Sequence, residues 1–351
     1  MAPATPGLPQ RSRTPSSLAM ACAPTLIDVH GRRISYLRIS VTDRCDLRCR
    51  YCMAEEMTFL PRSEILSLEE MALIAERFIA RGTTKIRLTG GEPLVRRDMI
   101  DLVQRLGDSI GSGLDELTMT SNGTRLAKHA VALADAGMRR INISLDSRDP
   151  ETFRHITRHG DIAQVLDGVA AAQDAGLRVK INMVALRGLN DREIAPMLRW
   201  CVEQDLDLTL IETMPLGAVE ADRADHFLPL TDVLADLREQ FDLERDDHRS
   251  GGPARYWRVQ GSGTRLGLIS PLTANFCDGC NRVRLTTEGK LYLCLGHEAH
   301  VDLKQAIREG GLAAVDDALD AALNIKPRRH DFSVERGSAP AVARHMSVTG
   351  G

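Results

Sequence analysis

Long apolar segments are absent from this chain. No stretch approaches the ~18 consecutive apolar residues of a membrane-spanning helix, which excludes such a helix. Aromatic residues are scarce, at 4% of the sequence, so few platforms exist on which nucleic-acid bases could stack. A strong net charge is also missing, since 45 Lys and Arg face 48 Asp and Glu. Because nucleic acids and anionic membranes bind net basic surfaces, we expect neither as a partner; a local basic pocket for a small anion stays open.

Acidic residues are missing from residues 1–27, which are rich in Pro, Ala, Ser and Thr. Such a segment cannot offset its ordering entropy by burial, so we expect a disordered leader there. Its prolines argue against the amphipathic helix of a transit peptide, and Met20 is an alternative start of the chain.

Cysteines are too few for a disulfide scaffold, with eight in 351 residues. Six of them form two triplets far apart in the chain: Cys45, Cys49 and Cys52, then Cys277, Cys280 and Cys294. This pattern predicts two metal sites in a reducing compartment, and we expect a cytoplasmic protein. Cys22 and Cys201 stand alone, and we interpret them as bystanders.

Short apolar segments alternate with helical patterns from residue 34 to about residue 215. The expected strands are Ile34–Val41, Lys85–Leu88, Glu116–Thr120, Arg140–Leu145, Val179–Leu186 and Leu206–Glu212. The expected helices between them are Leu68–Arg81, Met99–Gly107, Leu126–Ala136, Ile162–Ala175 and Asp191–Gln204. Six βα units predict an α/β fold, a partial (βα)6 barrel of the TIM type whose functional loops follow the strand C-termini.

The βα rhythm breaks after residue 217, where we place a domain boundary. Residues 28–217 would form the partial barrel, and residues 218–351 a C-terminal α+β extension that carries the second cysteine triplet. In this extension we expect helices at Leu230–Gln240 and Leu303–Leu323, and a hairpin of Tyr256–Val259 and Leu266–Ser270 with its turn at Gly261–Gly263.

The first triplet has C-x3-C-x2-C spacing and directly follows the first expected strand. Three thiolates are one short of the four that close a [4Fe–4S] cluster, so one iron would stay open for another ligand. The alternative is a zinc site, but zinc sites favour paired C-x2-C knuckles and a fourth ligand, and no Cys or His follows nearby.

The second triplet has C-x2-C-x13-C spacing and again leaves one iron open. A closed Cys3His zinc site is the alternative, because His297 and His300 follow Cys294. Arg282 and Arg284 alternate along an expected strand and therefore face the same side, where arginine side chains suit a phosphate group.

The first triplet, with Tyr51 before its last cysteine, resembles the radical S-adenosylmethionine (SAM) superfamily. Gly90-Gly91-Glu92-Pro93, at the end of the second expected strand, resembles the motif of that superfamily that binds the methionine part of SAM. The resemblance implies that SAM ligates the open iron and that an electron from the cluster cleaves it to methionine and a 5′-deoxyadenosyl radical.

Both triplets together, with the terminal Gly350-Gly351, resemble the GTP 3′,8-cyclase family of molybdenum cofactor biosynthesis from about residue 30 to the end. This resemblance implies two [4Fe–4S] clusters, the second of which binds the guanine of GTP. The residues that it implies as cluster ligands are Cys45, Cys49, Cys52, Cys277, Cys280 and Cys294, and Gly350 and Gly351 join the first three as catalytic residues. The implied SAM contacts are Tyr51, Gly91, Ser144 and Met214, and the implied GTP contacts are Arg38, Arg87, Thr120, Lys180, Arg282, Val283 and Arg284.

The implied reaction converts GTP to (8S)-3′,8-cyclo-7,8-dihydroguanosine 5′-triphosphate, the first step of molybdenum cofactor biosynthesis. The radical abstracts the 3′ hydrogen, C3′ adds to C8 of guanine, and an electron and a proton complete the product. The implied partners are GTP, a flavodoxin or ferredoxin as electron donor, and cyclic pyranopterin monophosphate synthase, which takes over the product; a homodimer stays open. One departure from the family pattern is Thr209, where many relatives carry Arg.

Other functions fit the sequence less well. A radical SAM peptide maturase with an auxiliary cluster is the main alternative, but such enzymes often bring further cysteines and a peptide-binding module. A two-cluster electron carrier or redox sensor leaves the Gly-Gly-Glu-Pro motif and the basic residues without a purpose.

Overall fold

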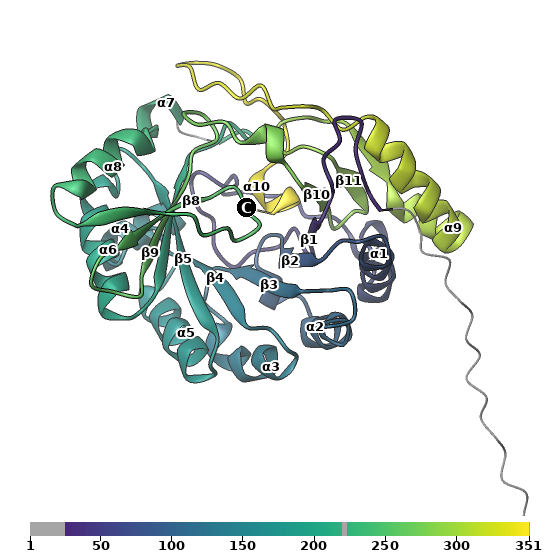
Figure 1. The fold of residues 1–351 in the computed structure, drawn as a ribbon, viewed down its shortest axis with the longest axis horizontal. Helices are drawn as coiled ribbons and strands as arrows, with labels where there is room; N and C mark the ends of the chain where they lie inside the picture. The colour runs from purple at the N-terminus through teal and green to yellow at the C-terminus, as the bar shows by residue number, and fades with distance from the viewer. Residues whose placement is uncertain (1–24, 220–222, 351) are drawn as a thin grey trace, which may run out of the picture.

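The computed structural model describes residues 25–219 and 223–350, and the curved sheet of its strands dominates the molecule (Figure 1). The strands are β1 (Tyr36–Ser40), β2 (Lys85–Thr89), β3 (Glu116–Ser121), β4 (Arg140–Ser144), β5 (Arg178–Ala185), β6 (Asp207–Glu212), β7 (Leu243–Asp246), β8 (Arg255–Val259), β9 (Arg265–Ile269), β10 (Arg282–Leu285), β11 (Lys290–Tyr292) and β12 (His300–Asp302). They form one sheet in the order β12-β11-β10-β1-β2-β3-β4-β5-β6-β9-β8-β7.

The parallel part of this sheet confirms the expected partial barrel and extends it. Strands β1 to β6 pair in parallel in chain order, as the six βα units predict. At the two edges, β10 pairs in parallel with β1 and β9 pairs in parallel with β6. The expected hairpin is present as antiparallel β8 and β9, but its second strand also continues the barrel sheet.

The helices are α1 (Leu68–Ala80), α2 (Met99–Gly107), α3 (Ala130–Asp135), α4 (Pro150–Thr157), α5 (Ile162–Asp174), α6 (Ile194–Glu203), α7 (Arg223–His226), α8 (Leu230–Arg238), α9 (Leu303–Asn324) and α10 (Met346–Thr349). Figure 1 shows α1, α2, α3 and α5 on the outside of the curved sheet and α10 inside it. The sequence analysis missed α4, α7 and α10, which have eight, four and four residues and are too short to show a repeated apolar pattern. No helix in the described residues is both long and apolar enough to cross a membrane.

The alternation of side chains along the strands divides the core from the barrel interior. In β1, Leu37 and Ile39 belong to the apolar core under the helices, so Tyr36, Arg38 and Ser40 point to the opposite face. The N-terminal expectation needs one correction: Leu26 is buried, and its backbone bonds to Arg81 and Ile34. Leu26 thus anchors residues 25–27 to the fold, although Thr25 and Ile27 are exposed, and residues 1–24 of the expected leader lie outside the described part.

Helix α1 begins with a capping box. The Ser67 hydroxyl accepts a hydrogen bond from the Glu70 amide at 3.1 Å, and the Glu70 carboxylate accepts one from the Ser67 amide at 2.7 Å. This cap satisfies amides that the helix itself leaves unpaired, while Met71, Ile74 and Phe78 are buried against the sheet.

Replacing Ser67 by Ala removes this cap. We expect the free energy of unfolding to fall by about 1 kcal/mol, the usual effect of losing an N-cap side chain. Urea denaturation of the apoprotein measures it, with Ser63→Ala, an exposed serine of the preceding turn, as the control. Equal stability of the two variants would contradict the assignment of the cap.

Candidate functional site

The two cysteine triplets lie at opposite ends of the barrel strands. Cys45 to Cys52 follow β1, at the C-terminal end of the parallel sheet, whereas Cys277 and Cys280 precede β10. A cavity in the barrel is lined by all three cysteines of the second triplet together with Arg38, Arg87, Lys180, Arg282, Arg284 and Met214. The structure therefore brings together residues from six separate segments that the sequence singled out.

The first triplet forms a tight loop of neighbouring thiols. The Leu47 amide donates to Cys45 Sγ at 3.4 Å, and the Cys52 amide donates to the Cys49 carbonyl at 2.9 Å. Burial raises the pKa values of Cys45 and Cys52 to about 12, and Asp146 adds to the effect at Cys52. Buried thiols with raised pKa values lose their protons only when a cation binds the sulfur, and an iron ion is such a cation. The residues present thus fit an iron–sulfur cluster.

The glycines of the Gly-Gly-Glu-Pro motif lie against this loop. The Gly91 amide donates to the Thr42 carbonyl and the Glu92 amide to the Arg44 carbonyl, both at 2.8 Å. A Cβ atom on Gly91 would lie 2.2 Å from the Arg44 oxygen, so only glycine allows the two segments to approach this closely. This contact positions the loop that begins at Cys45; the expected contact of Gly91 with SAM stays a prediction.

Glu92 is a site residue that the sequence analysis quoted but did not assign. Its buried carboxylate accepts hydrogen bonds from the Asn122 amide at 2.6 Å, the Ser121 hydroxyl at 3.0 Å and the Leu94 amide at 3.0 Å. Burial raises its pKa to about 7. The Asn122 side chain in turn donates to Cys45 Sγ at 3.7 Å, so Glu92 holds Asn122 against the first triplet.

Tyr51 is fixed by Asp146, which the sequence analysis also missed. The Tyr51 hydroxyl donates to Asp146 Oδ2 at 2.7 Å, and Asp146 Oδ1 accepts from the Val184 amide at 2.8 Å. Burial raises the pKa of Asp146 to about 6. This bond ties the cysteine loop to the ends of β4 and β5, where Ser144 is the last residue of β4.

Parallel register aligns the basic residues of the cavity in rows. Arg38 on β1 lies beside Arg87 on β2 and beside Arg284 on β10. Two residues earlier on β1, Tyr36 lies beside Lys85 on β2 and beside Arg282 on β10. Because every second residue of a strand faces the same side, both rows face the barrel interior.

The cavity is strongly electropositive. Burial lowers the pKa of Lys180 well below its usual value, and the charge of Arg87 lowers it further. Burial and then Arg282 lower the pKa of Arg284 to about 10. Burial opposes ionisation of Tyr36, yet Arg87, Arg38, Lys85 and Arg282 bring its pKa down to about 8. Such crowding of positive charge is costly unless an anion binds there.

Arg87 and Thr120 form a pair at this cavity. Arg87 Nη1 donates to the Thr120 hydroxyl at 3.1 Å, whereas its buried Nε has no hydrogen-bond partner among the described residues. A buried donor without a partner is available to a bound anion.

Val283, an implied GTP contact, and Thr209, the departure from the family pattern, lie on strands of the same sheet. Val283 belongs to the apolar core, so only its backbone can reach the cavity between Arg282 and Arg284. Thr209 lies on β6 beside Gly267, and a Cβ on Gly267 would meet both Thr209 Oγ1 and the Tyr256 ring at 2.9 Å. The Tyr256 ring, whose hydroxyl accepts a hydrogen bond from Lys180 at 3.1 Å, thus occupies space that a longer side chain at position 209 would need.

The zinc alternatives find no support in the geometry. His297 Nε2 lies 2.9 Å from the Arg329 carbonyl, and His300 Nδ1 lies 2.7 Å from the Glu298 carbonyl. Within residues 25–219 and 223–350, no three His, Cys, Asp or Glu side chains converge as ligands of one metal ion would. A [4Fe–4S] cluster carries its cysteines on different irons and therefore spreads them more widely.

Cys201 is buried in the core, as a bystander would be.

The second triplet differs from the first in its charge environment. Burial tends to raise the pKa of Cys280, but Lys326 and Arg282 outweigh it and lower that pKa to about 7. These cations therefore favour the thiolate form of Cys280, which is the form that ligates iron. Phe276 and Phe332 add apolar walls to the same cavity.

The C-terminal segment enters the barrel. Arg284 Nη1 donates to the Gly350 carbonyl at 2.8 Å, and α10 lies inside the curve of the sheet (Figure 1). Gly350 has φ +72°, and a Cβ there would lie 2.1 Å from a Thr89 side-chain atom, so the position requires glycine. Gly351 lies outside the described residues.

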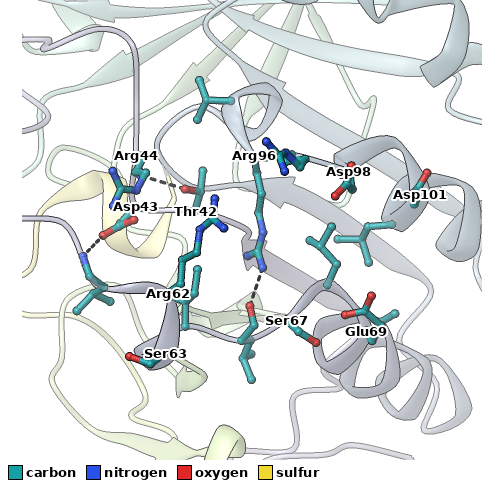
Figure 2. Close-up of a pocket in the computed structure, with 18 of the residues that line it drawn as sticks. Thr42, Asp43, Arg44, Arg62, Ser63, Ser67, Glu69, Arg96, Asp98 and Asp101 are labelled. Carbon is teal, nitrogen blue, oxygen red and sulfur yellow. Dashed lines mark hydrogen bonds between the residues drawn. The ribbon is translucent and has the colours of Figure 1, made fainter.

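A second groove lies outside the barrel, between the first turns of α1 and α2 (Figure 2). Its lining includes Arg44, Ser67 and Arg96 but none of the cysteines. Arg96 is already bonded to the Leu66 carbonyl at 2.6 Å, so its charge supports the local backbone. We therefore assign the chemistry to the barrel cavity.

Comparison with known proteins gives two family models in tandem. The radical SAM superfamily model matches residues 39–201, and the model described as molybdenum cofactor synthesis C matches residues 206–332. A GTP 3′,8-cyclase of Erythrobacter litoralis (strain HTCC2594) is 58% identical and covers 94% of this chain and 99% of its own length. One from Rhizobium etli (strain CIAT 652) is 55% identical and covers 96% of this chain and 97% of its own.

Solved structures with the same fold are more distant. Streptococcus suis SuiB bound to S-adenosylmethionine has a TM-score of 0.59 at 15% identity, covering 84% of this chain and 67% of its own. The anSMEcpe protein with bound AdoMet has a TM-score of 0.58 at 16% identity, covering 85% and 82%. These two likenesses show the fold, whereas the full-length relatives show the family. The chain belongs to the GTP 3′,8-cyclase family of radical SAM enzymes.

Proposed function

We propose that this protein converts GTP to (8S)-3′,8-cyclo-7,8-dihydroguanosine 5′-triphosphate in the first step of molybdenum cofactor biosynthesis. The observation that carries the proposal is the barrel cavity, which is lined by five basic residues together with the second cysteine triplet. A triphosphate of about −4 balances such a cluster of positive charge. The full-length GTP 3′,8-cyclase relatives support the same substrate.

Radical SAM enzymes use a [4Fe–4S] cluster and SAM, and the first triplet fits that cluster. Cys45, Cys49 and Cys52 would be its ligands, with Tyr51, Gly91, Ser144 and Met214 as contacts of SAM. When bound, cluster and SAM supply the 5′-deoxyadenosyl radical that removes the 3′ hydrogen of GTP. Asp146 holds Tyr51 and Glu92 holds Asn122, so both side chains help to fix the loop that would carry the cluster.

The second triplet would hold another [4Fe–4S] cluster through Cys277, Cys280 and Cys294, with its open iron toward the guanine. Arg38, Arg87, Thr120, Lys180, Arg282, Arg284 and the Val283 backbone would bind the rest of the nucleotide. Held at both ends, GTP keeps C3′ close to C8, and proximity accelerates the ring closure. Gly350 and Gly351 would act beside the bound nucleotide, where Arg284 already holds the Gly350 carbonyl.

The remaining expectations on partners belong to the same proposal. A flavodoxin or ferredoxin would deliver electrons, cyclic pyranopterin monophosphate synthase would take over the product, and the enzyme would work in the cytoplasm. A homodimer stays open.

The direct test is anaerobic reconstitution with iron and sulfide, followed by dithionite and SAM. We expect formation of 5′-deoxyadenosine to rise strongly with GTP and to stay low with ATP or without nucleotide. Cleavage of SAM at the same rate with and without GTP would contradict GTP as the substrate and favour a peptide maturase. If iron-loaded protein did not cleave SAM at all, an electron carrier would be favoured.

Replacing Arg282 by Ala removes one charge from the cavity. We expect kcat/KM for GTP to fall roughly 10- to 100-fold, as loss of a charged hydrogen bond does, while basal SAM cleavage without GTP stays largely intact. Arg284→Ala should weaken GTP use as well, and it also releases the Gly350 carbonyl. Arg258→Ala on β8, whose side chain is 53% exposed, is the matched control. Normal GTP turnover in both cavity variants would refute the pocket assignment.

Replacing Gly91 by Ala pushes a methyl group into the Arg44 carbonyl. We expect this variant to hold less iron and to lose SAM cleavage, because the loop of the first triplet must move. Iron analysis and the 5′-deoxyadenosine assay measure both effects. In the control, Gly176→Ala, the new methyl meets nothing within 4 Å, so this variant shows the cost of a side chain at a positive φ (+76°) without a steric clash, and we expect it to keep its iron. Full iron content and activity in Gly91→Ala would show that the close approach is dispensable.

A further inference from the structure

Lys326 is a buried lysine at the second triplet that the sequence analysis did not single out. It follows α9 directly, and its side chain extends between β10 and the segment that leads to Cys294. Its ammonium donates to Cys280 Sγ at 3.8 Å, to the Arg282 carbonyl at 3.0 Å and to the Leu293 carbonyl. An ammonium has three N–H donors, so these three acceptors use its full capacity.

No carboxylate in the described part of the chain forms an ion pair with Lys326; Asp28, which is paired with Arg32, attracts it only from farther away. The neighbouring cation Arg32 is different, because Asp28 pairs with it at 2.7 Å while its other nitrogens bond to carbonyls, including that of Cys277 at 2.9 Å. A buried cation without a counter-ion costs several kcal/mol, so this position calls for an anion next to Cys280.

An iron–sulfur cluster ligated by three thiolates is such an anion. Cluster potentials depend on net charge, hydrogen bonds to the sulfurs and exposure to solvent. A positive charge that donates to a ligating sulfur stabilises the reduced cluster, which carries one more negative charge, and so raises the reduction potential.

We propose that Lys326 is a positioning residue of the second centre, which clamps Cys280 to both ends of the chain segment between Cys280 and Cys294 and raises the reduction potential of the cluster bound there. This inference rests on the proposed function, because it requires a second cluster. The lowered pKa of the Cys280 thiol, with Lys326 as the leading attractive charge, agrees with the geometry.

The test uses the full-length chain with Cys45, Cys49 and Cys52 replaced by Ala, so that only the second centre can load. In this parent we compare Lys326→Met, which keeps most of the length of the side chain without its charge, with Lys326→Arg, which restores a charge. The control is Lys290→Met on β11, since Lys290 is one-third exposed (34%) and pairs with Glu288 at 3.2 Å. The readouts are iron per chain and the midpoint potential from redox titration followed by electron paramagnetic resonance.

We expect the parent to bind about four irons, Lys326→Met to shift the midpoint to more negative potential, and Lys326→Arg and Lys290→Met to stay near the parent. Loss of the cluster from Lys326→Met with retention in Lys326→Arg would support the clamp as well. Equal potentials in Lys326→Met and Lys290→Met, or loss of iron from both Lys326 variants, would overturn the inference. A parent that binds no iron would instead refute the second centre itself, before any lysine is changed.

Discussion

Positive charge confined inside the barrel is the constraint on which the rest of the structure depends. The register of three parallel strands places Arg284, Arg38 and Arg87 side by side, and Lys180 joins them from across the sheet. No single strand could concentrate charge in this way, since its next residue on the same face lies two positions along the chain. This crowding of cations is unfavourable by itself, and a bound anion would relieve it.

The two cysteine triplets, at the two ends of this interior, have neighbours of opposite charge. Acidic and thiol neighbours surround the first triplet, where burial holds the thiols neutral until iron binds. Cations surround the second, where Lys326 and Arg282 favour the Cys280 thiolate. The two triplets therefore differ in charge environment as well as in position.

Close backbone contacts connect these parts. Gly90 and Gly91 lie against the carbonyls of Thr42 and Arg44, so the first cysteine loop is held by the second strand's end. Gly350 lies against Thr89, the last residue of that same strand, and Arg284 from β10 holds its carbonyl. The first cluster loop, the C-terminal segment and the basic cavity thus share one small region, which explains why glycine occurs at three of its crowded positions.

Local sequence determined the six strands β1 to β6 and most of the helices of the barrel, both cysteine triplets and the basic residues, because periodicity and spacing are properties of neighbouring residues. Only the tertiary structure decided that β9 and β10 extend the parallel sheet, that Val283 turns into the core, and that Glu92, Asp146 and Lys326 support the cysteines. Their partners are 30, 95 and 46 residues away in the chain. A buried polar side chain acquires its role from whatever completes its hydrogen bonds, and folding alone supplies that neighbour.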